Sequence, residues 1–236
     1  MINTNLDRLM RSIGWGDPNG GLWFIGLEEG SDWRDQGEID DFLSRESLKK
    51  AGDAQYESFA APEAGQSVSR DSRSQVWLFE SKIAAALSAT VRGPYDYAGR
   101  CLWFNGFGTF HGNLLPLGKP RLANWPAHYR SLFGLGPEDR DRYTLIVRKR
   151  RYPTIRDLHK ASRPQATICF GKTYWMEFED LFDLWADEPA DGSDTSLRIF
   201  SEKRIVLAPF FGVGQMSDAL CARLIQLLQQ WQVRLP

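Results

Sequence analysis

The chain has 236 residues, of which 42% are hydrophobic, 25% charged and 13% aromatic, and its formal net charge is −1. This length and apolar content suffice for a hydrophobic core, and they exclude a disordered, collagenous or low-complexity protein. The longest apolar runs are shorter than the roughly 18–20 residues of a membrane-spanning helix, and the near-zero charge argues against a protein that coats nucleic acid without selectivity.

Apolar runs that end in turn residues predict five strands, at residues 22–26, 102–104, 143–147, 166–171 and 204–208. Continuous apolar runs of this length are typical of parallel strands that are buried on both faces. Helical periodicity predicts helices at residues 5–13, 74–89, 173–185 and 217–231, the last with Ser217 as its N-cap. Strands that alternate with helices predict a three-layer α/β/α sandwich with a central, mainly parallel sheet.

We expect one domain over residues 1–236, with polar surface insertions at 31–73 and 186–196. The three cysteines, Cys101, Cys169 and Cys221, are widely spaced and form no CxxC or Cys/His cluster, so neither a zinc site nor a disulfide framework is expected. The first residues contain no apolar stretch of the signal-peptide kind, and we expect a reduced, cytoplasmic protein.

Charge is distributed unevenly along the chain. Residues 99–163 hold 13 Lys and Arg against 4 Asp and Glu, whereas residues 28–63 hold 11 acidic and 4 basic residues, and residues 173–194 hold 8 acidic residues and no basic one. The densest basic cluster is Arg148, Lys149, Arg150 and Arg151. It predicts a face for nucleic-acid phosphates, and the alternative is a solvated strand end and loop.

In an open α/β sheet, ligands bind beyond the carboxyl ends of the strands, so the residues that follow each strand are the candidates. Gly26 to Gly30 follow the first strand and carry Glu28, whose carboxylate is suited to activating water. Trp33 follows closely and is a candidate for stacking on a ring. The alternative interpretation of this segment is an acidic surface turn.

The segment from Trp103 to Pro120 combines aromatic, Asn, His and Gly residues. Asn113 is suited to reading a base edge, Phe107 or Phe110 to stacking on a base, and His111 to catalysis. The alternative is an aromatic core segment with a structural histidine.

Two glycine-containing turns follow the later strands. Gly171-Lys-Thr resembles the end of a P-loop, but Ala166 stands where that pattern needs its first glycine, so we reject a P-loop. Gly212 and Gly214 precede the last predicted helix, where the backbone and the helix N-terminus at Ser217 are suited to a phosphate.

The order of these segments resembles the uracil-DNA glycosylase superfamily over about residues 20–230. The segments that carry the resemblance are Phe24 to Gly30, Asn113 to Pro116, Ile168 to Gly171, and Ile205 to Pro209 with the loop to Ser217. Two positions depart from the family pattern: Glu29 stands at the motif proline and Ala208 at the motif histidine, which stabilises charge on the leaving base.

The resemblance implies hydrolysis of the N-glycosidic bond of a base flipped out of DNA, with no metal and no organic cofactor. Glu28 would activate water, and His111 would replace the missing histidine. The base would contact Phe107 or Phe110 and Asn113 or Asn105, within a pocket that also includes Gly26, Gly30 and Pro209. Gly212, Gly214, Ser217 and the basic cluster at 148–151 would approach the phosphates.

Two other interpretations remain open on the sequence alone. The same loops suit an enzyme that acts on a nucleoside or another phosphorylated metabolite, since a fold does not fix a function. Alternatively, the nine tryptophans and the acidic segment would form the surface of a non-catalytic module that binds nucleic acid or protein.

Overall fold

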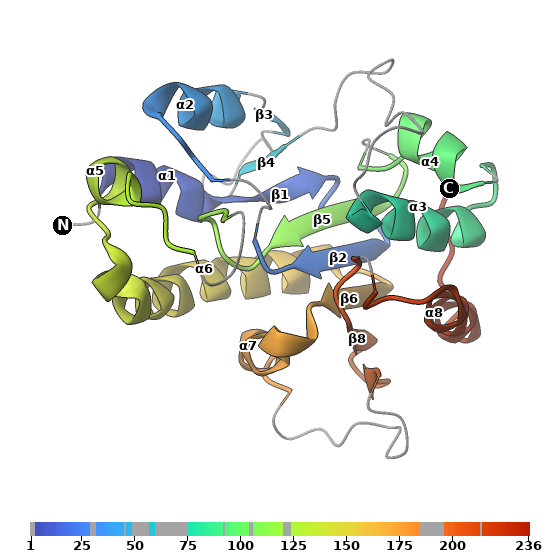
Figure 1. The fold of residues 1–236 in the computed structure, drawn as a ribbon. Helices are drawn as coiled ribbons and strands as arrows, with labels where there is room; N and C mark the ends of the chain where they lie inside the picture. The colour runs from blue at the N-terminus through green and yellow to red at the C-terminus, as the bar shows by residue number, and fades with distance from the viewer. Residues whose placement is uncertain are drawn as a thin grey trace.

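A computed structural model describes residues 3–28, 32–44, 46–48, 57–59, 75–91, 93–103, 106–119, 124–184, 196–212 and 214–236. These residues form a mixed α/β fold around one sheet with the strand order β3-β4-β1-β5-β2-β6-β8-β7 (Figure 1). The strands are β1 Ser12–Gly16, β2 Leu22–Gly26, β3 Glu46–Leu48, β4 Glu57–Phe59, β5 Thr109–Asn113, β6 Ala166–Phe170, β7 Arg198–Phe200 and β8 Ile205–Ala208.

The middle of the sheet is parallel. β2 lies between β5 and β6 and pairs with both in parallel, and β6 pairs in parallel with β8. Antiparallel pairs join β1 to β5 and β7 to β8. The carboxyl ends of β5, β2, β6 and β8 therefore meet at one edge of the sheet.

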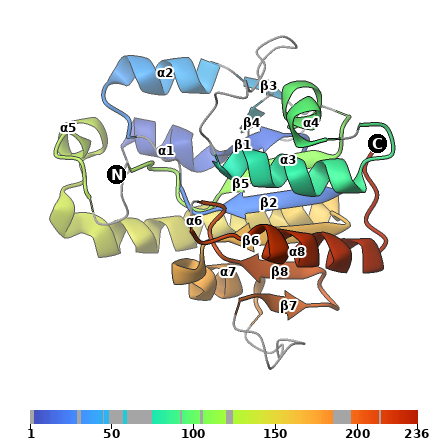
Figure 2. The same ribbon diagram turned by 45° about the vertical axis from the view of Figure 1, so that its right-hand side comes forward.

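The helices are α1 Thr4–Arg11, α2 Gln36–Ser44, α3 Gln75–Leu87, α4 Pro94–Arg100, α5 Tyr129–Phe133, α6 Arg140–Ser162, α7 Trp175–Phe182 and α8 Asp218–Gln230, with 3₁₀ turns at Pro137–Asp139 and Lys172–Tyr174. Buried side chains form two clusters, one shared by α1, α5, α6 and α7 and the other by α3, α4 and α8. Figure 2 shows α3 and α8 in front of the sheet and α6 behind it.

Three of the predicted strands are confirmed. They are β2, β6 and β8, whose residues are buried throughout. The four predicted helices are present as α1, α3, α7 and α8, and the hydroxyl of Ser217 accepts a hydrogen bond from the Leu220 amide as an N-cap. The three cysteines are buried and free.

The strand predicted at residues 143–147 is wrong, because these residues lie in α6. Tyr143, Val147, Arg151 and Ile155 are buried, and their spacing of four residues is that of a helix face. The strand predicted at 102–104 is also wrong: residues 102 and 103 form a turn after α4, and Phe104 lies outside the described residues. The strand of this region is β5, a few residues later.

The segment predicted as an insertion at 31–73 contributes to the fold where it is described. It contains α2, whose Ile39 and Leu43 join the buried cluster of α1 and α6, and the short strands β3 and β4, which extend the sheet beyond β1. Of the second segment, 186–196, the structure describes Ser196 alone. No helix in the described part of the chain has the length and apolar character to cross a membrane.

Candidate functional site

The carboxyl ends of the parallel strands bring together residues that are far apart in the sequence. Gly26 at the end of β2 pairs with Asn113 at the end of β5, and Phe170 at the end of β6 pairs with Ala208 at the end of β8. This edge of the sheet is where an open α/β fold binds ligands.

Gly26 lies so close to its neighbours that a side chain there would push the ends of two neighbouring side chains aside. A Cβ atom on this residue would lie 2.9 Å from Oδ1 of Asn113 and 2.8 Å from Cζ of Phe170. The absence of a side chain at Gly26 thus lets the Asn113 amide and the Phe170 ring lie over the end of β2. Asn113 has a polar group suited to a base edge at the position where the sequence predicts one.

Glu28 follows β2 and forms a buried ion pair with Lys119. Oε2 of Glu28 lies 3.1 Å from Nζ of Lys119, and the two side chains are 5% and 8% exposed. Oε2 of Glu28 makes no hydrogen bond within the described residues. Burial raises the pKa of Glu28 to about 7, while Lys119 acts in the opposite direction. A carboxyl group with this pKa can both take and give a proton at neutral pH.

His111 lies on the same face of β5 as Asn113, two residues earlier, and is held by a buried carboxylate. Nδ1 of His111 is 2.7 Å from Oε1 of Glu80 in α3, and Oε2 of Glu80 accepts a hydrogen bond of 3.0 Å from Nε1 of Trp103. Sequence reasoning missed Glu80. The signal was a single acidic residue within the apolar helix 75–87.

The two phenylalanines predicted to stack on a base lie elsewhere. Phe110 points to the opposite face of β5 and packs against Trp23 with ring centres 4.6 Å apart, fully buried. Phe107 precedes β5, at the end of the strand away from Asn113, and packs against the cluster of α3 and α8. The prediction is wrong for Phe110, because side chains alternate between the faces of a strand.

The loop from Pro209 to Ser217 borders the same edge. Phe211 stacks on Phe170 with ring centres 4.5 Å apart and an interplanar angle of 9°, and the exposed Phe210 lies 6.2 Å from the same ring. Phe170 therefore links this loop to Gly26 and Asn113. Gly214 is exposed, whereas Pro209 and Gly212 are buried, and the Ser217 side chain caps α8.

The basic cluster at 148–151 is a stretch of α6, and its members have different environments. Arg148 forms ion pairs with Glu177 at 2.7 Å and Asp180 at 3.6 Å, and Arg150 forms one with Asp7 at 3.2 Å. Lys149 is exposed. Arg151 is 1% exposed, so the prediction that it contacts nucleic acid is wrong.

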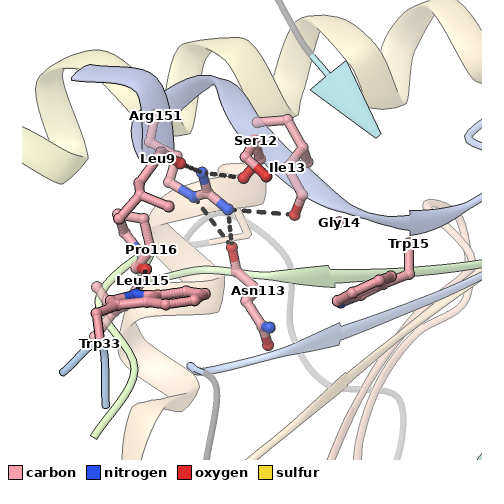
Figure 3. A pocket seen from close by; sticks show the side chains of 10 residues that line it. All are labelled: Leu9, Ser12, Ile13, Gly14, Trp15, Trp33, Asn113, Leu115, Pro116 and Arg151. Atoms are coloured by element: carbon pink, nitrogen blue, oxygen red, sulfur yellow. Dashed lines mark hydrogen bonds between the residues drawn. The ribbon is translucent and has the colours of Figure 1, made fainter. Parts of the chain in front are cut away.

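Arg151 instead fixes the backbone beside Asn113 (Figure 3). Its guanidinium donates to the carbonyl of Asn113 at 3.1 and 2.7 Å. It also donates to the carbonyls of Leu9, Met10, Ser12 and Ile13. A cavity of about 20 Å³ lies among these residues. Arg151 thereby ties the end of β5 to the connection between α1 and β1, and the Asn113 side chain points away from it (Figure 3).

A larger pocket lies beside Lys119. Its volume is about 520 Å³, and its lining consists of Asp32, Asn124, Trp125, Pro126, His128, Pro137 and Arg140. Nζ of Lys119 and the guanidinium of Arg140 each lie 5.9 Å from the centre of the Trp125 ring. Nε2 of His128 lies 3.2 Å from Oδ2 of Asp32. The pocket therefore offers an aromatic face flanked by cationic groups.

Three further residues named from the sequence are Trp33, Gly30 and Asn105. Trp33 is buried, and its indole donates to the carbonyl of Pro116, so its ring belongs to the core. Gly30 and Asn105 lie outside the described residues. No protein-family model, no curated protein and no solved structure matches the chain.

Proposed function

We propose that the protein is a divergent uracil-DNA glycosylase-like hydrolase with a three-layer α/β/α architecture, and that it cleaves the N-glycosidic bond of a base flipped out of DNA. The observation that supports this most is the meeting of Glu28, Asn113 and the loop 209–217 at the carboxyl edge of β2, β5 and β8. These are the segments that carry the resemblance.

In this proposal, the Glu28 carboxylate takes a proton from the attacking water, since its pKa of about 7 keeps it partly ionised at neutral pH. The Asn113 amide hydrogen-bonds the edge of the flipped base. His111, oriented by Glu80, supplies the charge stabilisation that Ala208 cannot give. The exposed Phe210, rather than Phe107 or Phe110, is the aromatic residue for the neighbouring bases.

The test is base excision from oligonucleotides that carry uracil or a damaged base, with cleavage of the resulting abasic site by alkali as the readout. We expect activity in the wild-type protein and its loss in Glu28→Gln and Asn113→Ala. Glu138→Gln is the matched control, because Glu138 is an exposed carboxylate in the 3₁₀ turn Pro137–Asp139 and pairs there with Arg130 at the surface. Wild-type protein that releases no base from any strand of the panel would overturn the proposal.

The salt dependence of binding separates this function from the two others. Binding to DNA that weakens steeply with salt indicates phosphate contacts. Tight binding of a nucleoside or phosphorylated metabolite with little salt dependence would instead favour a small-molecule enzyme. DNA binding that Glu28→Gln and Asn113→Ala leave unchanged, without base release, would favour a binding module.

A further inference from the structure

Lys119 is a buried primary amine beside the proposed catalytic carboxylate. Its Nζ lies 3.1 Å from Oε2 of Glu28, and its side chain is 8% exposed. Burying an ammonium group is costly, because the charge loses its contact with water. An aliphatic residue at position 119 would fill the same space without this cost. A lysine amine that has given up its proton is a nucleophile that forms Schiff bases with carbonyl compounds, and Oε2 of Glu28, 3.1 Å away, is positioned to accept that proton.

The surroundings of Lys119 fit a nucleotide that carries such a carbonyl. Trp125, whose ring centre is 5.9 Å from Nζ of Lys119, lines the pocket of about 520 Å³. Arg140, whose guanidinium lies 5.9 Å from the centre of the same ring, also lines this pocket, together with His128 and Asp32. Aromatic faces stack on bases, and arginine binds phosphate. A strand with its base or phosphate in this pocket would bring a sugar toward the amine.

We propose that Lys119 gives the protein a second activity, in which its amine forms a Schiff base with the C1′ aldehyde of an abasic deoxyribose and the strand is then cut by β-elimination. This inference rests on the proposed glycosylase function, because base hydrolysis generates the aldehyde that Lys119 would attack.

The steps balance without an oxidant or a reductant. Glu28 accepts one proton from the ammonium group of Lys119, and the lone pair of the nitrogen bonds to C1′. The aldehyde oxygen leaves as water with the proton returned by Glu28 and a second amine proton, so the third proton stays on the nitrogen of a protonated imine. The Glu28 carboxylate next removes a proton from C2′, a C1′–C2′ enamine forms, and the C3′–O bond breaks with release of the phosphate. Water then hydrolyses the unsaturated imine and frees the amine.

The experiment uses an oligonucleotide that already carries an abasic site, so it does not depend on base excision. The full-length protein is mixed with this strand and with sodium borohydride, which reduces an imine to a stable amine, and the covalent complex is detected by denaturing electrophoresis. Peptide mass mapping then identifies the modified residue. We expect a trapped complex at Lys119 and, without borohydride, strand cleavage.

Two variants control for folding and for the presence of other amines. Lys119→Arg keeps a cation beside Glu28 but cannot form the imine, so trapping and cleavage should be lost while the thermal unfolding temperature stays near that of the wild type. Lys172→Arg is the matched control, because Lys172 is an exposed lysine that follows β6 at the same edge of the sheet. It should trap as the wild type does.

The outcomes separate the two proposals. Trapping that persists in Lys119→Arg, that maps to another amine, or that is absent from the wild type overturns the role of Lys119. Base release from uracil-containing strands without trapping leaves the glycosylase proposal standing and removes this one. Trapping on the abasic strand without base release supports the Lys119 activity and removes the glycosylase proposal.

Discussion

Glu80 and Glu28 are both buried carboxylates next to the central strands, but their surroundings differ. Each oxygen of Glu80 accepts a hydrogen bond, from His111 and from Trp103. Glu28 has the ammonium group of Lys119 as its ion-pair partner, and its Oε2 makes no hydrogen bond within the described residues. A buried carboxylate whose oxygens all accept hydrogen bonds makes the core more rigid. A buried carboxylate with an oxygen that accepts none, at an edge where ligands bind, can still accept a hydrogen bond from a substrate.

Arg151 belongs with Glu80 in this comparison, because its guanidinium donates to five backbone carbonyls. If the complete set of partners is what stabilises the interior, the variants of these two residues should lower stability most. Variants of Glu28 should change the pH dependence of stability and the chemistry instead.

The largest effect is expected for Arg151→Met. This change leaves the carbonyls of α1, β1 and β5 without their shared donor, and removing one partner of a buried charged network costs on the order of 3–5 kcal/mol. Urea unfolding measures the loss. Arg150→Met is the control, because Arg150 is exposed and pairs with Asp7 at the surface, and its loss should cost less than about 1 kcal/mol. Equal losses in the two variants would contradict the role given to Arg151.

The next effect is the pH dependence caused by Glu28. Its pKa is about 7 in the folded protein and 4.5 without the fold, so between these values the folded state holds a proton that the unfolded state releases. The contribution of this proton to the free energy of unfolding is fully present below pH 4.5 and is lost as the pH rises to about 7. The difference is on the order of 3 kcal/mol. Glu28→Gln should abolish this loss, as measured by urea unfolding at several pH values.

His159 provides an internal check with the opposite sign. Burial lowers its pKa from 6.5 to about 4, so the unfolded state binds the proton first as the pH falls. Its stabilisation is present above pH 6.5 and is lost as the pH falls to about 4. In the wild type the two dependences oppose each other between pH 4.5 and 6.5. Glu28→Gln should therefore show stability that rises with pH in this window, and an unchanged profile would contradict the environment assigned to Glu28.

Glu80→Gln should have a smaller effect on stability than Arg151→Met. The amide keeps the shape of the side chain, but its NH₂ group replaces one of the two oxygens that face His111 and Trp103. One of these two hydrogen bonds is therefore lost. Losing a hydrogen bond to a charged acceptor costs about 1.5–3 kcal/mol. Thermal unfolding measures this cost, and NMR of the His111 ring reports whether its tautomer changes. A stability equal to that of the wild type would remove the distinction between Glu80 and Glu28.

The sequence was sufficient to predict three of the four strands whose carboxyl ends meet at the proposed site. β2, β6 and β8 are uninterrupted apolar runs, and such runs are buried on both faces of a parallel sheet. β5 was missed because Thr109, His111 and Asn113 put polar groups on one of its faces. The buried His111 is explained by its partner Glu80, which lies in α3 and is about 30 residues away in the sequence.

The partners of the two buried cations, Lys119 and Arg151, are also distant in the sequence and could not be predicted from it. Lys119 and Arg151 look like surface residues in the sequence, because nothing local shows a lysine's partner at Glu28 or an arginine's acceptors at the end of α1. For Arg151, the available signal was its position in the stripe of Tyr143, Val147 and Ile155, which marks the buried face of a helix. The four consecutive basic residues hid this periodicity and suggested a single basic surface.

The smallest effect is expected for Arg148→Ala, which tests the exposed part of that basic run. The Arg148 side chain is 44% exposed, and its ion pairs with Glu177 and Asp180 lie at the surface between α6 and α7. Exposed ion pairs contribute about 0–1 kcal/mol, so thermal unfolding should change little. If Arg148 reaches phosphate through exchange of these partners, DNA binding should weaken equally for all sequences and its salt dependence should become shallower. A stability loss as large as that of Arg151→Met would show that burial and complete hydrogen bonding do not separate the two arginines.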